Sequence, residues 1–210
     1  GPVVLDFAKN AQTAVIDYQP QSIDFIRSYK PVHTPSDETI RKAAEMINES
    51  VKPFMLVGQG VELAGANKEL LELCEKAQIP FGQTMLGLSA APSDHPLNMG
   101  MLGMHGNLAP NVMTNQCDLL IAVGMRFDDR VTGNLDTYAK QAKVIHFDID
   151  ASEIDKNVKT DLAVRGDCKS TLPRVSESVL PSSHNSWIEG FKPYVEKEYN
   201  RVIGKAICPQ

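Results

Sequence analysis

This chain of 210 residues lacks long hydrophobic runs and has no excess of positive charge. Its most apolar run, 119–124, is far shorter than the roughly 20 residues that a membrane-spanning helix needs. The 21 Lys and Arg residues are outnumbered by 26 Asp and Glu residues, which disfavours a surface that follows a nucleic-acid phosphate backbone. We therefore expect a soluble protein that binds neither membranes nor nucleic acid.

Close cysteine pairs and several catalytic motifs are also missing. The four cysteines stand singly, at positions 74, 117, 168 and 208, without the spacing of a zinc site or a disulfide framework. There is no Gly-x-Ser-x-Gly nucleophile turn and no Gly-x-x-x-x-Gly-Lys phosphate loop. We expect no metal site, a reducing cytoplasmic compartment, and a binding domain in place of a complete catalyst.

Short apolar runs that stop at a glycine or an acid recur from residue 53 onward, and helical periodicity follows most of them. The expected strands are 54–58, 79–82, 119–124, 144–148 and 162–164. Continuous apolar strands with intervening helices indicate a parallel sheet that is buried on both faces. The pattern predicts an α/β fold: a three-layer α/β/α, doubly wound, mostly parallel, Rossmann-like sheet.

Four helices are expected around this sheet. The first begins near Ser36 after a polar, proline-interrupted linker over 7–35, and the second contains the apolar stripe of residues 70, 73, 74 and 77. A third follows Asp167, and a last helix is expected over Trp187–Ile203. Their apolar positions are Ile40, Ala43, Ala44 and Ile47 in the first, Leu172, Val175 and Val179 in the third, and Trp187, Phe191, Val195 and Tyr199 in the last.

Glycine turns after strands are the places where a doubly wound sheet binds ligands. Gly58-Gln-Gly60 resembles the opening of a dinucleotide fingerprint, but Leu63 stands at the position of the third glycine. On its own this motif is weak, because two glycines can simply make a tight turn. The long stretch 87–111 has little periodicity and is expected to be a binding loop, with Met104 and His105 near the ligand.

The segment Gly124–Gly133 places two arginines and two aspartates directly after the most apolar run. The guanidiniums of Arg126 and Arg130 suit a phosphate or a carboxylate, which each can bind through two hydrogen bonds. The alternative is that they pair with neighbouring aspartates in a solvated loop, for about 0–1 kcal/mol per pair. We favour a ligand, since this density of charge follows a strand end.

Acidic residues end the strand that begins at Val144. Asp148 and Asp150 occupy a position where an acid can accept a ribose hydroxyl, although acids there can also cap the next helix. His146 is expected to face a helix layer. No fourth ligand accompanies these three side chains, so their spacing does not indicate a metal site.

Three motifs together resemble the catalytic subunits of the acetolactate synthase (acetohydroxyacid synthase) family of thiamine-diphosphate enzymes: Leu102-Gly-Met-His-Gly106, Arg126-Phe-Asp-Asp-Arg-Val-Thr-Gly133 and the opening Gly1-Pro-Val. Pro92–Pro96 and Phe147–Asp150 add to the likeness. The resemblance implies that 1–33 is the end of a pyrimidine-binding domain and a linker, 34–181 a central FAD-binding domain, and 182–210 a helix and linker to a pyrophosphate-binding domain. The chain is thus expected to be a fragment.

The family condenses two pyruvates, or pyruvate and 2-ketobutyrate, to acetohydroxyacids in branched-chain amino-acid synthesis. The resemblance implies that FAD binds this domain, while thiamine diphosphate and Mg²⁺ bind domains outside it. It also implies partners: other domains of the same chain, a homodimer or tetramer, and a small regulatory subunit. The fragment is expected to be inactive alone, because the family's Gly-Asp-Gly motif is not in this sequence.

Motif matching to the family implies the site residues. Arg130 would hold the carboxylate of the second ketoacid, and Met104 and Asp129 would line the substrate channel. The implied FAD contacts are Gly58, Gly60, Thr84, Met85, Leu86, Leu102, Gly103, Met104, His105, Gly124, Arg126, Asp128, Val131, Asp148, Ile149, Asp167 and Cys168.

Other readings stay open from the sequence. The chain could be the central domain of a pyruvate oxidase or a related carboligase, although the turn Arg126–Arg130 argues against it. A free-standing NAD-binding domain of sirtuin-like or transhydrogenase-like topology could use the same sheet, although the lack of paired cysteines weakens a sirtuin. The chain could also be an interaction module with a vestigial ligand site.

Overall fold

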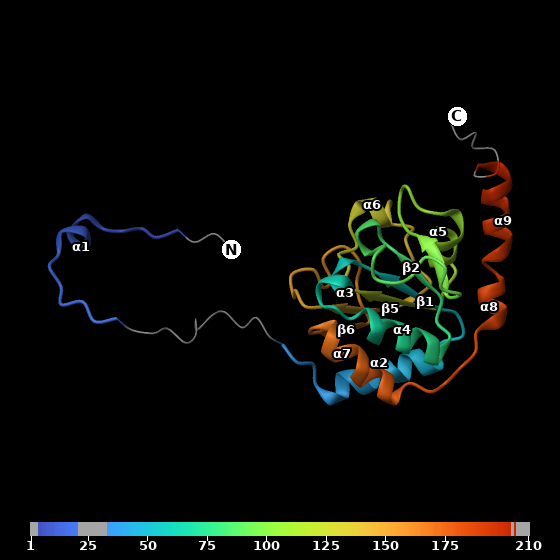
Figure 1. Ribbon diagram of the computed structural model, residues 1–210, viewed down its shortest axis with the longest axis horizontal. Coiled ribbons are helices and arrows are strands. Elements are labelled where there is room, and N and C mark those ends of the chain that lie inside the picture. The colour runs from blue at the N-terminus through green and yellow to red at the C-terminus, as the bar shows by residue number, and fades with distance from the viewer. Residues whose placement is uncertain (1–3, 21–32, 203, 205–210) are drawn as a thin grey trace. The chain divides into compact units, whose positions relative to one another are not determined.

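The computed structural model describes residues 4–20, 33–202 and 204, and the chain divides into two units, 1–31 and 32–210. The described part of the first unit contains the short helix α1 (Lys9–Thr13), which buries no residue. The opening Gly1-Pro-Val motif and residues 21–32 of the expected linker lie outside the described residues. Most elements of the second unit are labelled in Figure 1.

A six-stranded parallel sheet forms the centre of the second unit, in the order β3-β2-β1-β4-β5-β6. Every residue of β1 and β4 is buried, as expected for strands that are covered on both faces. The predicted α/β fold is confirmed. The strands are β1 (Pro53–Val57), β2 (Phe81–Gln83), β3 (Asn98–Met101), β4 (Leu119–Val123), β5 (Lys143–Asp148) and β6 (Leu162–Arg165).

One face of the sheet is covered by α2 (Asp37–Glu49), α4 (Asn67–Ala77) and α7 (Cys168–Ser178). Figure 1 shows α2 and α7 side by side below the strands, and they are in contact. Ser36 caps α2 by accepting a hydrogen bond from the amide of Thr39 at 3.2 Å. The buried stripes of α2 and α4 are those that the sequence predicts.

The opposite face is covered by α5 (Leu108–Thr114), α8 (Asn185–Glu189) and α9 (Lys192–Arg201). Along β1, Phe54 packs into this layer while its neighbour Met55 packs into the other, because successive strand side chains point to opposite faces. The indole Nε1 of Trp187 donates to the carbonyl of Pro53 at 2.8 Å. This bond fixes the start of α8 to the sheet.

The expectation of one helix over 187–203 is wrong in two respects. The segment forms two short helices, and Val195 and Tyr199 are exposed by 50% and 59%. Pro193 explains the break. In a continuous helix its ring would clash with the carbonyl of Glu189, four residues earlier, which is where α8 ends. Tyr194 packs against the core in place of Val195. Residue 203 lies outside the described residues.

The stretch expected to be a loop over 87–111 contains the edge strand β3 and the first residues of helix α5. Short elements complete the unit and carry the turns above the sheet: α3 (Gln59–Leu63), the 3₁₀ helix η1 (Met85–Gly87) and α6 (Asp129–Thr132). No helix in the described ranges is long and apolar enough to cross a membrane. Those ranges also bring together no group of three His, Cys, Asp or Glu side chains that could hold a metal ion.

Candidate ligand site at the carboxyl edge of the sheet

A cavity of about 960 Å³ is lined by the turns that follow β1, β2, β4, β5 and β6 and by the loop after β3. It lies where the strand order reverses between β1 and β4. Doubly wound sheets bind their ligands at this switch point, and the volume is at the upper end of the range for small-molecule pockets. The cavity can therefore accommodate a ligand of dinucleotide size.

Nearly all the residues that the motif resemblance implies as FAD contacts line this cavity, and so does Arg130. Two predicted residues do not. Gly103 belongs to the loop after β3, and an added Cβ there would be 2.6 Å from the carbonyl oxygen of Arg130. Asp129 is the first residue of α6 and is exposed. The structure therefore brings most of the predicted residues together around one cavity, but the sequence does not distinguish lining residues from their neighbours in the same turns.

Several lining residues were absent from the predicted set. Asp150 is a candidate for a ribose contact from its position after the strand, and Met101 belongs to β3, which the sequence does not indicate. No sequence signal marks Glu153, which the loop after β5 brings to the cavity. The complete set of unpredicted lining residues is Gln59, Leu63, Ala64, Met101, Met125, Phe147, Asp150, Glu153 and Gly166.

The glycines of the turns after β1 and β4 lie against each other. The amide of Gly60 donates to the carbonyl of Gly124 at 2.9 Å. A Cβ at Gly58 would lie 2.2 Å from that same oxygen, and one at Gly60 would lie 2.6 Å from the Gly124 Cα. Since no side chain fits there, the close contact of the two turns already requires glycine, whatever ligand the cavity binds.

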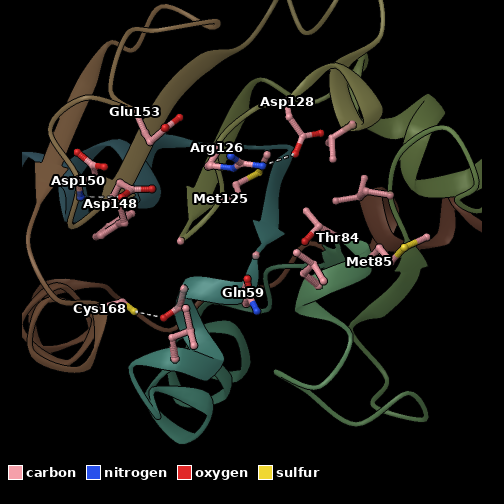
Figure 2. A pocket seen from close by; sticks show the side chains of 18 of the residues that line it. Gln59, Thr84, Met85, Met125, Arg126, Asp128, Asp148, Asp150, Glu153 and Cys168 are labelled. Atoms are coloured by element: carbon pink, nitrogen blue, oxygen red, sulfur yellow. Dashed lines mark hydrogen bonds and ion pairs between the residues drawn. The ribbon is translucent and has the colours of Figure 1, made fainter. Parts of the chain in front are cut away.

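The turn after β4 directs Arg126 toward the cavity. Its neighbours Met125 and Phe127 are buried, whereas the Arg126 side chain is 65% exposed. Phe127 has a φ of +52°, which a non-glycine residue rarely adopts. Figure 2 shows Arg126 extended between Asp148 and Asp128. The backbone thus places the guanidinium at the centre of the site.

Both sequence interpretations of the arginines find support in the geometry. The Arg126 guanidinium approaches the Asp128 carboxylate at 3.7 Å, but an exposed pair of this kind contributes about 0–1 kcal/mol. The Arg130 guanidinium instead lies 3.7 Å from the sulfur of Met104. Neither contact is strong enough to commit an arginine to a purely structural role.

Acidic side chains gather at one end of the cavity. Figure 2 shows Asp148, Asp150 and Glu153 together, with Thr84 and Met85 on the opposite side of Arg126. Asp148 is 9% exposed, and its Oδ1 accepts the amide of Asp150 at 2.8 Å. Hydrogen bonds from the backbone and hydroxyl of Ser152 hold the pKa of Asp150 below its usual value. This end offers carboxylate acceptors to a ligand hydroxyl.

Cys168 and Asp167 close the floor of the site at the start of α7. The Asp167 carboxylate accepts the amide of Lys169 at 2.8 Å and so caps the helix. The Cys168 thiol donates to the carbonyl of Gly60 at 3.4 Å. Burial, together with the charge of Asp167, raises the pKa of this thiol to about 11. The cysteine is therefore a packing residue and a poor nucleophile.

The chain is similar to acetolactate synthase large subunits. The chain is 42% identical over 196 residues to the "Probable acetolactate synthase large subunit" of Methanocaldococcus jannaschii, covering 90% of this chain and 33% of that protein. It is 39% identical over 219 residues to the "Acetolactate synthase large subunit" of Corynebacterium glutamicum, covering 100% of this chain and 35% of that protein. The chain thus spans about a third of the length of these relatives.

Residues 40–175 match the family described as "Thiamine pyrophosphate enzyme, central domain". The match begins inside α2 and ends inside α7, so it includes the six-stranded sheet and the turns that line the cavity. It covers more than half of the chain. The chain therefore belongs to the family of thiamine pyrophosphate enzyme central domains.

Proposed function

We propose that the chain is the central domain of an acetolactate synthase catalytic subunit and that its cavity binds FAD. The observation that carries the proposal is the similarity to acetolactate synthase large subunits at about 40% identity over most of the chain. In this proposal the complete enzyme condenses two pyruvates, or pyruvate and 2-ketobutyrate. Residues 1–33 and 182–210 would connect the central domain, 34–181, to domains on either side.

The lining residues fit a flavin dinucleotide. The Arg126 guanidinium can offset the charge of a diphosphate near the glycine turns. The Asp148 carboxylate can accept a ribose hydroxyl at the acidic end. At the other end, Met85, Leu86 and Met104 are more than half exposed and offer apolar surface to a flat ring. FAD would serve as a structural group here, since the family reaction involves no net redox change.

Arg130 would bind the carboxylate of the second ketoacid through its guanidinium, beside the Met104 side chain. Asp129, at the start of α6, would lie along the substrate channel. Thiamine diphosphate and Mg²⁺, held by other domains, would supply the carbon–carbon bond-forming chemistry. The proposed partners are those other domains, a second copy of the catalytic subunit in a dimer or tetramer, and a small regulatory subunit, all in the cytoplasm.

The test is a titration of the chain with FAD, monitored by flavin fluorescence, with NAD as competitor. We expect saturable binding of one FAD per chain that NAD does not displace. Arg126→Ala should weaken FAD binding at least tenfold. Arg41→Ala is the matched control, because Arg41 pairs with Glu45 on α2 and does not line the cavity.

Two results would contradict the proposal. Displacement of FAD by NAD would favour a nicotinamide-binding domain, and the absence of saturable FAD binding would remove the flavin from the proposed role of this chain. Activity is tested separately in a protein that joins this domain to pyrimidine- and pyrophosphate-binding domains. Formation of acetolactate from pyruvate is expected there when thiamine diphosphate and Mg²⁺ are added.

A further inference from the structure

A fully buried histidine lies next to the cavity without lining it. His146, on β5, has 0% exposure, and its Nε2 lies 2.8 Å from the backbone carbonyl oxygen of Met125. The same nitrogen is 3.6 Å from Oδ2 of Asp148. One imidazole thus faces both the residue before Arg126 and the carboxylate at the acidic end of the cavity.

The contact with Met125 determines which ring nitrogen carries a hydrogen. A carbonyl oxygen can only accept, so Nε2 must carry the hydrogen and donate it. In the neutral ring Nδ1 then has no hydrogen, and this atom is buried with no partner among the described residues. A hydrogen at Nδ1 would be a buried donor without an acceptor, which is unfavourable. The surroundings therefore select the tautomer that bonds the turn.

The rest of the turn is held in the same way. The ring of Phe127 packs edge-on against His146, with centroids 5.1 Å apart and planes at 74°. The carbonyl of Phe127 accepts a hydrogen bond of 2.9 Å from the Asn157 amide group. The carbonyls on both sides of Arg126 are thus bound by side chains from β5 and from the loop after it.

We propose that His146 is a positioning residue. It holds Arg126 and Asp148 at the relative position in which both can contact a bound dinucleotide. The donor at Nε2 fixes the carbonyl before Arg126, and the same edge of the ring lies against Asp148, two residues along the strand on the same face. His146 would not touch the ligand. The identity of the ligand as FAD rests on the proposed function, whereas the positioning of the turn rests on the contacts alone.

The test compares two substitutions of His146, one without and one with a hydrogen-bond donor for the Met125 carbonyl. His146→Leu puts an apolar side chain in the core and removes the hydrogen bond. His146→Gln introduces a side-chain amide whose N–H can donate to the same carbonyl. Tyr138→Phe is the matched control. Tyr138 packs against the same Phe127 at 6.3 Å, and its buried hydroxyl has no partner among the described atoms, so its removal leaves the turn bonded.

Three measurements are made on each protein: the FAD dissociation constant, the hydrogen exchange of amides in 124–128 without ligand, and the midpoint of thermal unfolding. We expect His146→Leu to weaken FAD binding at least tenfold and to speed exchange in the turn at least tenfold. His146→Gln should stay within about threefold of the unsubstituted chain in both. Tyr138→Phe should change neither.

The outcomes separate this proposal from the flavin proposal. Unchanged exchange in a folded His146→Leu chain, or a His146→Gln chain as impaired as His146→Leu, would overturn the positioning role. If His146→Leu does not fold, ¹⁵N NMR of the imidazole in the unsubstituted chain decides, because hydrogen at Nδ1 in place of Nε2 would overturn it. If the unsubstituted chain binds no FAD, the flavin proposal fails while the exchange and NMR results still test His146.

Discussion

The amide of Met104 donates a 2.7 Å hydrogen bond to the carbonyl oxygen of Arg130. This bond joins the loop after β3 to the start of α6. Gly103 allows the approach, with a φ of +97°. The Asn111 side chain bonds both the amide and the carbonyl of Gly103 at 2.9 Å. The relative position of Met104 and Arg130 is therefore set by the backbone.

Gly103→Ala should destabilise the chain by about 2–3 kcal/mol, because a left-handed backbone and a steric clash act together. The added Cβ would lie 2.6 Å from the Arg130 oxygen. Gly65→Ala is the control: Gly65 has a φ of +61° but open space around its Cβ position, so only the backbone term of about 1 kcal/mol applies. Urea unfolding followed by the fluorescence of Trp187 measures both. Equal losses would show that the contact with Arg130 carries no strain.

In a complete enzyme that contains this domain, Arg126 and Arg130 should affect different properties: flavin retention and ketoacid binding. Arg126→Ala should lower flavin retention at least tenfold, because it removes a cation beside the diphosphate. Arg130→Ala should raise the ketoacid KM at least tenfold and leave the flavin content unchanged. Flavin absorbance and steady-state kinetics provide the two measurements. A full flavin content in the Arg126 variant, or unaltered ketoacid kinetics in the Arg130 variant, would contradict the assignment.

The strands buried on both faces are the ones that the sequence indicates most clearly, since burial leaves a continuous apolar run. Leu119–Val123 is the clearest, and each of its residues is buried. Strand β3 gives no such signal. Its residues are only partly buried, and besides its backbone pairing with β2 it makes a 2.8 Å side-chain hydrogen bond from Asn98 to Gln83, a tertiary contact. An edge strand of this kind is defined by its neighbour more than by its own pattern.

The candidate site was predictable where its residues directly follow a strand or belong to a motif. Asp148 and Arg126 satisfy that condition, whereas Glu153 reaches the cavity only through the path of the loop after β5. The reason for the glycines also lay beyond the sequence. Gly58 has no Cβ because Gly124 occupies that space, a contact between turns that only the fold brings together.

The thiol of Cys168 should react slowly with iodoacetamide although it lines the cavity. Burial raises its pKa to about 11 from an ordinary value of 9.0. Since the thiolate is the nucleophile, a shift of this size lowers the reactive fraction at pH 8 about 100-fold relative to the unfolded chain. Peptide mass spectrometry of folded and urea-unfolded chain measures the two rates. Similar rates in both states would contradict a protected thiol.

The same shift predicts how stability depends on pH. Above pH 9 the unfolded chain loses the Cys168 proton while the folded chain retains it, so the free energy of unfolding falls as pH rises toward 11. Below pH 9 the contribution is fully present. The thiol should account for about 1 kcal/mol of the loss at pH 10. Urea unfolding at pH 8 and pH 10 should show that the free energy of unfolding falls less in Cys168→Ala than in the unsubstituted chain. An identical fall in the two proteins would contradict the raised pKa of Cys168.

Of the apolar positions predicted for the last helix, Phe191, at the start of α9, should contribute to stability, whereas Val195 should not. Phe191 is 1% exposed and packs 5.4 Å from both Phe54 and Trp187, so Phe191→Ala should cost about 3–5 kcal/mol. Val195→Ala, one turn later, should change stability by less than about 0.5 kcal/mol, because half of Val195 is already exposed. Circular dichroism during urea unfolding gives both values without relying on the Trp187 signal. A loss above about 1 kcal/mol for Val195→Ala would mean that this face of α9 is covered in solution.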